Sequence, residues 1–168
     1  DGFSVRCLKG SILSSSSSAK SSSSEAMSSS SSSSIVYSTI KDARDNQTYR
    51  IVTIGSQTWM AENLKYLPSV VGFGTGSGTT PHYYVYGYNG TYDDFGRNGT
   101  NVTDAKATAN YNTYGVLYNW PAAMNGEASS TTNPSGVQGV CPDGWHLPSD
   151  AEWTELTDYL GGTSVAGG

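Results

Sequence analysis

The sequence predicts a fold that mixes antiparallel β-strands with helices and joins them by long loops. A hairpin pattern over residues 45–60 and a well-capped helix after Ser149 are the two clearest local signals. Between them, residues 70–112 are rich in Gly, Thr, Asn and Tyr and show little periodicity.

The first predicted unit of structure is a β-hairpin. After a short β-prone run at 35–37, residues 45–47 (DNQ) read as a turn, and Thr48–Ile54 is dense in β-branched and aromatic residues. Gly55-Ser56 is a two-residue hairpin signal, so the segment Gln57–Met60 is predicted to return as a second strand.

The middle of the chain gives weaker signals. Residues 61–66 have the pattern of a helical turn, which Pro68 would end. Across residues 70–112 we expect long loops with one or two short strands. The Gly-rich run at 72–78 lacks both the Lys-Ser/Thr ending and the following helix of a phosphate-binding loop, so an ordinary loop is predicted there.

Two further helices are predicted in the C-terminal third. Residues 114–124 place Val116, Leu117 and Trp120 on one helical face, and Pro121 is tolerated in a first turn. The last helix has the clearer start, because Ser149 and Glu152 have the spacing of a capping box. Its predicted apolar face and its C-terminal stop are Trp153, Leu156 and Leu160, followed by Gly161-Gly162.

A serine-rich stretch at 11–34 divides the chain into three parts. Serine-rich sequence cannot bury enough apolar surface to offset the entropy lost on ordering, so this stretch is predicted to be a flexible linker. Residues 1–10 would then end one folded unit, and residues 35–168 would belong to the next. The chain starts at Asp1 without a signal-peptide pattern, so we expect an interior piece of a modular protein.

The composition is that of a secreted or cell-surface domain. Charged residues make up 14% of the chain, against about a quarter in ordinary globular proteins, while Tyr (12) and Gly (20) are abundant. A net charge of −5 without any Lys/Arg run excludes a nucleic-acid partner. No apolar stretch approaches the ~20 residues of a membrane span.

The two cysteines, Cys7 and Cys141, lie on opposite sides of the linker. Without C-x-x-C spacing they do not indicate zinc binding or redox catalysis, and in a chain of this composition they are expected to be half-cystines.

The sequence shows no catalytic, cofactor or metal site. His146 is expected to be a hydrogen-bonded structural residue and His82 to be exposed, and neither has a partner that would complete a nucleophile–base set. Oxygen-bearing residues could suggest calcium, but their spacing is not that of an EF-hand loop, so a solvated loop is preferred. These residues are Asp93, Asp94, Asn98, Asn101 and Asp104.

Tyrosines crowd one region and form the candidate ligand-binding set. Exposed tyrosines present flat apolar faces suited to stacking on sugar rings or to anchoring a protein partner, whereas alternate tyrosines could equally line the buried face of a strand. The set is Tyr83, Tyr84, Tyr86, Tyr88 and Tyr92. The tryptophans lie in patterned apolar segments and are predicted to be core residues: Trp59, Trp120, Trp145 and Trp153.

Three segments together resemble the Fibrobacter succinogenes major paralogous domain of bacterial surface and secreted proteins. They are YRIVTIGSQTWMAENLKYLPSV, YGVLYNWPAAMNG and GVQGVCPDGWHLPSDAEWTELTDYLGG, in the order of the family and covering roughly residues 45–168. The opening DGFSVRCLKG resembles the closing segment of the same domain. The chain would therefore contain the tail of one copy, a linker and the first part of the next.

The resemblance implies an α+β, C-type-lectin-like fold with two helices, small antiparallel sheets and long loops, truncated before its final half. It also implies that Cys141 pairs with the terminal cysteine of a complete copy, of which Cys7 is the sequence equivalent. Two alternatives follow for residues 1–10: they dock as the missing closing strand and bring Cys7 to Cys141, or they are a free tail.

The function expected from this resemblance and from the tyrosines is a non-catalytic binding or adhesion module. Its ligand would be a glycan or a cell-surface protein, and its other neighbours the further domains of the same parent chain. The alternatives are a formylglycine-generating type of enzyme, which would need reactive thiols or a metal, and a passive spacer domain.

Overall fold

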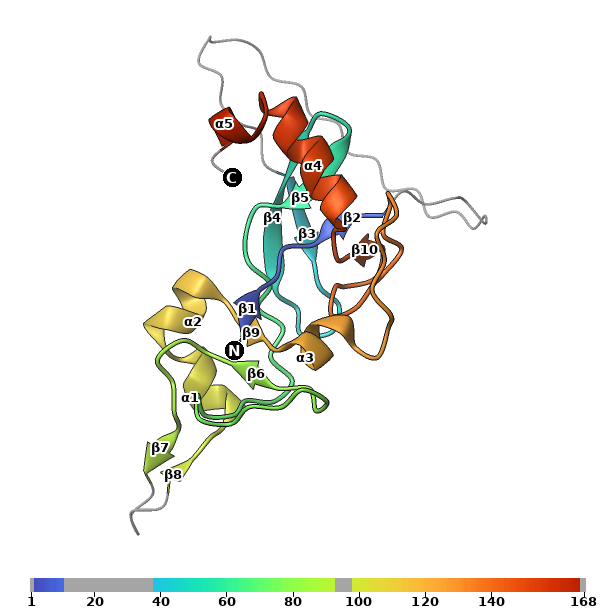
Figure 1. The fold of residues 1–168 in the computed structure, drawn as a ribbon. Helices are drawn as coiled ribbons and strands as arrows, with labels where there is room; N and C mark the ends of the chain where they lie inside the picture. The colour runs from blue at the N-terminus through green and yellow to red at the C-terminus, as the bar shows by residue number, and fades with distance from the viewer. Residues whose placement is uncertain (1, 11–37, 93–97, 167–168) are drawn as a thin grey trace, which may run out of the picture.

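The computed structural model describes residues 2–10, 38–92 and 98–166. They form helices and three antiparallel sheets, which confirms the predicted α+β mixture (Figure 1). The predicted linker at 11–34, the β-prone run at 35–37, and Asp93 and Asp94 lie outside the described residues.

A five-stranded sheet has the strand order β10-β2-β5-β4-β3. Its strands are β2 (Leu8–Lys9), β3 (Ser38–Lys41), β4 (Thr48–Ile54), β5 (Gln57–Met60) and β10 (Trp145–His146). The predicted hairpin is confirmed, because β4 pairs with β5 around Gly55-Ser56. Gly55 has a φ of 60°, and a Cβ atom there would lie 2.8 Å from the ring of Tyr159, so glycine suits this turn on both counts.

Two smaller sheets complete the strands. The first has the order β1-β9-β6, and the second pairs β7 with β8. Their strands are β1 (Phe3–Ser4), β6 (Tyr83–Tyr84), β7 (Thr91–Tyr92), β8 (Asn98–Gly99) and β9 (Leu117–Tyr118).

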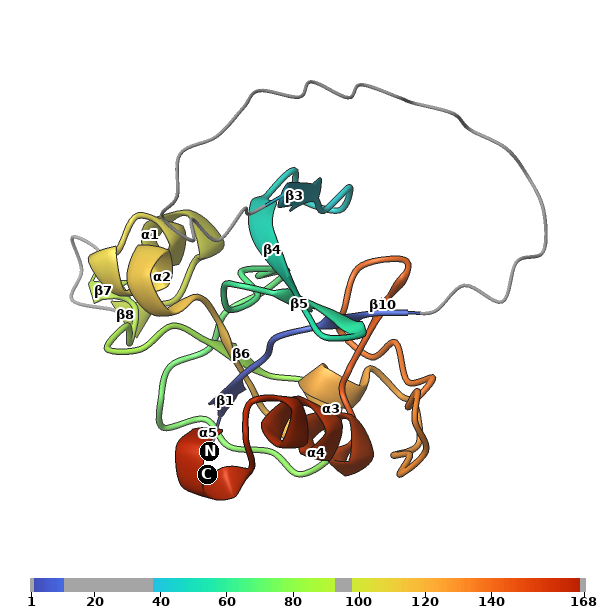
Figure 2. The same cartoon turned by 90° about the horizontal axis from the view of Figure 1, so that it is seen from above.

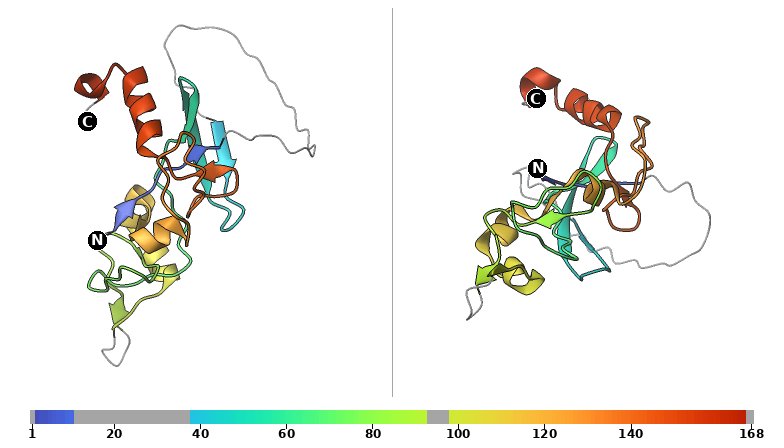
Figure 3. Two further views of the ribbon diagram at one scale, coloured as in Figure 1. Left: turned by 45° about the vertical axis from the view of Figure 1, so that its right-hand side comes forward. Right: turned by 60° about the horizontal axis from the view of Figure 1, so that its bottom comes forward.

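The described residues form five helical segments where the resemblance implied two. They are α1 (Val102–Lys106), α2 (Ala109–Tyr114), α3 (Trp120–Met124), α4 (Asp150–Tyr159) and α5 (Thr163–Ala166). Among them only α4 exceeds two turns. Figures 2 and 3 show α4 and α5 grouped together and well apart from α1 and α2, which form a second group.

The N-terminal residues belong to the same folded unit as the rest of the described chain. β1 pairs with β9 in one sheet, and β2 lies between β10 and β5 in the other, so residues 3–9 join two sheets (Figure 1). Cys7 and Cys141 form a disulfide across a sequence separation of 134, with their Cα atoms 5.9 Å apart. Of the two alternatives left by the sequence, the structure has the docked closing strand.

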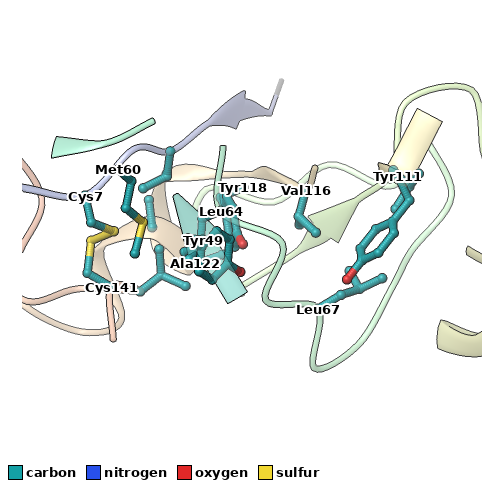
Figure 4. Packing of buried hydrophobic residues seen from close by; sticks show 14 of the residues in the cluster. Cys7, Tyr49, Met60, Leu64, Leu67, Tyr111, Val116, Tyr118, Ala122 and Cys141 are labelled. Atoms are coloured by element: carbon teal, nitrogen blue, oxygen red, sulfur yellow. A yellow bond between two sulfur atoms is a disulfide. The ribbon is translucent and has the colours of Figure 1, made fainter. Parts of the chain in front are cut away.

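The core is continuous from this disulfide through the large sheet to α2. Figure 4 shows the buried side chains running from Cys7 and Cys141 past Tyr49 and Leu64 to Tyr111. Both cysteines are completely buried. Because N-terminal, central and C-terminal residues share this cluster, the fold cannot be divided at the serine-rich stretch.

Three buried tyrosines, which we call the tyrosine clamp, fasten one irregular segment to the core. Tyr49, Tyr111 and Tyr118 all use their hydroxyl groups on the backbone of Lys65 and Tyr66. The Tyr49 hydroxyl accepts from the Lys65 N–H (2.9 Å), while Tyr111 donates to the Lys65 carbonyl (2.9 Å) and Tyr118 to the Tyr66 carbonyl (2.8 Å). Burial raises the pKa of each phenol, to about 12 for Tyr111.

An ion pair reinforces the same region. Arg44 donates to both oxygens of the buried Asp42 carboxylate and to the Val140 carbonyl (2.9 Å), and its guanidinium lies 4.0 Å from the centre of the Tyr66 ring. Burial alone would raise the pKa of Asp42, but the hydrogen bonds and charge of Arg44 outweigh burial and lower it. Asp42 therefore stays ionised at neutral pH.

The prediction of one helix over 114–124 is wrong. The segment divides into the end of α2, the strand β9 and the short helix α3. Strand β9 is paired on both sides, by β1 and by β6, and these ladders replace the helical hydrogen bonds. Pro121 does lie in the first turn of α3, where Asn119 provides the N-cap.

The predicted helical turn at 61–66 is also wrong. The amides of this segment have distant partners in place of carbonyls four residues back. Ala61 donates to the Arg50 carbonyl, Leu64 to the Val5 carbonyl and Lys65 to the Tyr49 hydroxyl. Sequence-distant neighbours override the local preference here.

Residues 70–112 contain more regular structure than predicted. The strands β6, β7 and β8 and the helix α1 all begin there, together with most of α2. Both helices start at a side-chain cap, because Asn101 accepts from the Asp104 N–H and Thr108 accepts from the Tyr111 N–H.

The capping box of α4 is confirmed, but its apolar face is not buried as predicted. The Ser149 hydroxyl accepts from the Glu152 N–H, the Glu152 carboxylate accepts from the Ser149 N–H, and the chain leaves the helix at Gly161 with a positive φ. Trp153 and Leu160 are each 44% exposed. The residue that α4 buries is Glu152.

Two of the four tryptophans predicted to be core residues lie at the surface. Trp59 and Trp145 are buried, whereas Trp120 is 58% exposed and Trp153 packs against Trp59 from outside, with ring centres 4.6 Å apart. The core assignment is therefore wrong for Trp120 and Trp153. The spacing of apolar residues along a short helix indicates which face of the helix is apolar, but not whether another part of the protein covers that face.

Candidate functional site

The structure separates the five tyrosines of the candidate binding set. Tyr84 and Tyr88 are buried, with their hydroxyls donating to the Thr75 and Asn101 carbonyls, and Tyr83 is partly buried with its ring against Tyr118. Tyr86 is exposed. The side chain of Tyr92 lies outside the described part of the chain.

Tyr86 forms an exposed pair with Tyr114, a residue that the sequence did not single out. We call these two side chains the tyrosine platform. Tyr86 comes from the turn after β6 and Tyr114 ends α2, and they are 63% and 49% exposed. Their ring centres are 5.8 Å apart and the ring planes meet at 75°, an edge-to-face arrangement.

Two asparagine side chains hold the backbone under the platform. Asn110 donates to the Tyr86 carbonyl and Asn63 donates to the Tyr114 carbonyl, each at 2.9 Å. Gly115, directly after Tyr114, has a φ of 73°, and a Cβ atom there would lie 2.7 Å from the Leu64 carbonyl oxygen. This close approach turns the chain from α2 into β9 and fixes where Tyr114 stands.

A hollow of about 380 Å³ lies beside the platform. It is lined by Ser4, Asn63, Tyr86, Tyr114 and Leu117. Ser4 and Tyr84 both pair with Leu117 in the three-stranded sheet, so the hollow rests on regular structure. It offers an apolar wall and two polar side chains.

A second, polar hollow of about 300 Å³ adjoins the first, and Asn63 lines both. Its other lining residues are Arg6, Arg50, Ala61, Glu62, Lys65, Asn112, Thr113 and Gly115. Asn63 also accepts a hydrogen bond from Arg6 Nε at 2.9 Å. Three cationic side chains and one carboxylate therefore meet here in a chain of net charge −5.

Glu62 is committed to its neighbour Arg50. Its carboxylate accepts from the Arg50 side chain (2.9 Å) and from the Arg50 N–H (3.1 Å). Partial burial would raise the pKa of Glu62, but these hydrogen bonds and the charges of Arg50 and Lys65 lower it. Glu62 therefore stays ionised at neutral pH.

The sequence matches the Fibrobacter succinogenes major domain over residues 52–167, more than half of the chain. This chain belongs to the Fibrobacter succinogenes major domain family. Neither the curated proteins nor the solved structures gave a match.

In this member of the family, His146 is hydrogen-bonded, as predicted, and its partner is Glu152. The buried imidazole Nε2 lies 2.7 Å from Oε1 of the buried Glu152. The other carboxylate oxygen, Oε2, accepts from the backbone N–H groups of Ser135 and Ser149. The pair joins β10 to the start of α4, which makes His146 the structural residue that the sequence predicted.

His82 also has hydrogen-bond partners. Its N–H donates to the Asn119 side chain at 2.9 Å, and its Nδ1 lies 3.3 Å from the Thr75 carbonyl oxygen. The residue is only partly exposed, where exposure was predicted. It packs edge-on against Tyr84 and so braces the Gly-rich loop.

The described residues contain no group of three or more His, Cys, Asp or Glu side chains that could hold a metal ion. In the same residues, no helix has the length and apolarity needed to cross a bilayer.

A third hollow, of about 210 Å³, lies between β1, α3 and α4 and is mainly apolar. The exposed aromatic residues Phe3, Trp120 and Trp153 line it. Phe3 and Trp120 have their ring centres 6.4 Å apart. Both misassigned tryptophans thus stand at the surface beside this groove, and Arg6 and several serine side chains add polar groups to its lining.

The platform was half visible in the sequence. Tyr86 was in the candidate set, whereas Tyr114 was taken as the first residue of a helix. The signal that could have found it is the Tyr114-Gly115 pair, since glycine is the commonest residue just after a helix end.

Proposed function

We propose that this domain is a non-catalytic carbohydrate-binding or adhesion module, with the tyrosine platform as its contact surface. The observation that supports it most directly is the exposed, edge-to-face pair of Tyr86 and Tyr114 beside two adjoining hollows. Sugars have an apolar C–H face and a rim of hydroxyl groups. An aromatic wall next to a polar hollow is complementary to both.

The backbone anchoring of the platform favours binding. Because Asn110 and Asn63 hold the carbonyls of the two tyrosines, the rings need little further ordering when a ligand arrives. Tyrosine itself loses little rotamer freedom, since it has two χ angles. Asn63, Asn112 and Thr113 supply neutral donors and acceptors for hydroxyl groups on the adjoining side.

The compartment proposed is the exterior or surface of a bacterial cell. Both cysteines of the chain are joined in a buried disulfide, which persists in oxidising surroundings. The low charged fraction and high tyrosine content agree with this location. For the α+β fold we propose the C-type-lectin-like class. An experimental structure of the chain would test that class directly.

Binding of the intact chain to an array of bacterial and plant glycans tests the function. Tyr86→Ala and Tyr114→Ala are each expected to lower affinity for the glycans bound by at least about tenfold, because each removes one stacking face. Tyr159→Ala is the matched control. Tyr159 is also an exposed tyrosine, 66% accessible, but it lies on α4, away from the lining of either hollow.

Absence of any glycan binding by the wild-type chain would contradict the proposal and favour the spacer alternative. Equal losses for Tyr86→Ala and Tyr159→Ala would place the binding surface elsewhere on the domain.

A further inference from the structure

Residues 2–10, which we call the closing segment, occupy a site formed by sequence-distant parts of the chain. Val5, Cys7 and Leu8 are all buried. Leu8 is paired on both sides, with Trp59 of β5 and with His146 of β10. The segment therefore provides an interior strand of the five-stranded sheet and not an edge strand.

Backbone groups of the surrounding domain depend on the closing segment. Met60 donates to the Cys7 carbonyl (3.0 Å) and Leu64 donates to the Val5 carbonyl (2.8 Å). Gly10 donates to the Gly144 carbonyl (2.9 Å). Without the segment the N–H groups of the buried residues Met60 and Leu64 would lose these partners, and a buried backbone group without a hydrogen-bond partner destabilises the fold. The place that the segment occupies between β5 and β10 is therefore a binding site for an extended strand, and we call it the receptor site.

The covalent connection between the closing segment and this receptor is long. The segment ends at Gly10, the described domain resumes at Ser38, and the serine-rich residues 11–34 lie between them. A tether raises the local concentration of its own segment to the order of millimolar when the linker is short and to less when it is longer, so a second copy at comparable concentration can compete for the same site.

We propose that the receptor site between β5 and β10 also accepts the closing segment of a second copy of this chain, with Cys7 of one copy bonded to Cys141 of the other. Reciprocal exchange gives a closed pair of chains in which every contact of the single chain is kept. The inference does not rest on the proposed carbohydrate binding, although Ser4 and Arg6 of the closing segment line the two hollows near the tyrosine platform.

The chemistry of the exchange needs no net oxidant. The thiolate of a small-molecule thiol attacks Cys141 Sγ, forms a mixed disulfide and releases the Cys7 thiolate. The Cys7 thiolate of the second copy then attacks Cys141 Sγ of the first, and the small thiol leaves again. Two disulfides within chains become two disulfides between chains, so the number of disulfide bonds is unchanged.

A peptide-capture experiment on the intact chain tests the receptor. The Cys7→Ser variant leaves Cys141 as the single thiol, and it is incubated with a synthetic peptide of residues 1–10 in a buffer of reduced and oxidised glutathione. Oxidised glutathione is the two-electron oxidant: it forms a mixed disulfide with one thiol, and the other thiol then displaces reduced glutathione. The control peptide carries Leu8→Asp and keeps its cysteine. We expect the native peptide to become disulfide-linked to Cys141 at least tenfold faster, because only it can fill the strand site.

Equal labelling by the two peptides would overturn the proposal, since it would reflect thiol reactivity alone. Absence of labelling by either peptide would overturn it as well. Near-ultraviolet circular dichroism of the Cys7→Ser variant checks that the domain is folded before the peptides are added.

A second measurement uses the wild-type chain and is independent of that variant. Tagged and untagged wild-type chains are mixed at millimolar concentration in glutathione buffer and then quenched with acid. We expect disulfide-linked tagged–untagged pairs whose peptide map contains the Cys7–Cys141 bond between chains. If every Cys7–Cys141 bond remains within one chain, the exchange does not occur.

Discussion

The tyrosine clamp and the tyrosine platform show two ways in which this domain uses the same residue. Tyr118 and the other clamp residues are buried and held by their hydroxyl groups, which bind the backbone of Lys65 and Tyr66. Tyr86 and Tyr114 are exposed and held by their own backbone carbonyls, which Asn110 and Asn63 bind. In the first arrangement the phenol is a structural group. In the second it is left available at the surface.

The comparison shows that a tyrosine-rich segment does not by itself indicate whether its side chains are buried or exposed. A phenol that is buried needs a hydrogen-bond partner, and the irregular segment at 64–67 supplies such partners in its backbone. A phenol anchored through its backbone keeps both its ring face and its hydroxyl for a ligand. The predictions below test this division.

The largest effect is expected at high pH. The folded state raises the pKa of Tyr111 from 10 to about 12 and raises those of Tyr49 and Tyr118, because burial disfavours the phenolate. Stability from the clamp is therefore complete below pH 10 and is lost as the pH rises from about 10 towards 12. Chemical denaturation at a series of pH values measures it.

Phenolate absorbance during the same titration provides the check. A fraction of the 12 tyrosines should ionise late and together with unfolding. If the free energy of unfolding stayed constant across this pH range, the clamp would not be a stabilising feature.

Tyr118→Ala is expected to destabilise the domain by about 3–5 kcal/mol. The change leaves a cavity in the core and also removes the hydrogen bond to the Tyr66 carbonyl. Urea denaturation followed by tryptophan fluorescence gives the value. A loss below about 1 kcal/mol would mean that the site collapses or that the residue is not buried.

Tyr118→Phe separates the hydroxyl group from the ring. It is expected to cost about 1–3 kcal/mol, because the ring still fills its place while the Tyr66 carbonyl loses its donor. Tyr114→Phe is the matched control on the platform, where the ring is exposed, and should leave the free energy of unfolding unchanged within about 0.5 kcal/mol. Similar losses for both variants would remove the distinction between clamp and platform.

The smallest effect on stability is expected for Tyr86→Ala. The ring is 63% exposed, and the hydrogen bond from Asn110 goes to the backbone carbonyl, which alanine retains. The free energy of unfolding should change by less than about 0.5 kcal/mol, while glycan binding falls as proposed above. A destabilisation above about 2 kcal/mol would assign the ring to the core and not to a binding surface.

Some elements of this fold were predictable from neighbours in the sequence. The turn at Gly55-Ser56 sets the register of its own hairpin, and the reciprocal bonds between Ser149 and Glu152 are made within one helical turn. Residues 61–66 and 114–124 failed as predictions for the opposite reason. Their backbone partners, such as Val5 and the strand β1, lie far away along the chain.

The candidate site was likewise predictable only in part. The family resemblance pointed to the pairing of Cys7 with Cys141, and the tyrosine cluster included Tyr86. The sequence did not indicate that α2 would bring Tyr114 to Tyr86, or that Trp153 would face outward, since both depend on how separate elements pack.

The amino-acid sequence alone was enough for the family, the mixed α+β character, the hairpin and the capping box of the last helix, because these rest on patterns and on contacts between near neighbours. Which tyrosines are buried and which are presented, and where residues 2–10 lie, followed only from the folded arrangement. The physical reason is that the burial of a side chain depends on the surface that packs against it as much as on the side chain itself. For this chain, those opposing surfaces come from segments distant in the sequence: Tyr118 and its partner Tyr66 are 52 residues apart, and the disulfide that closes the core spans 134.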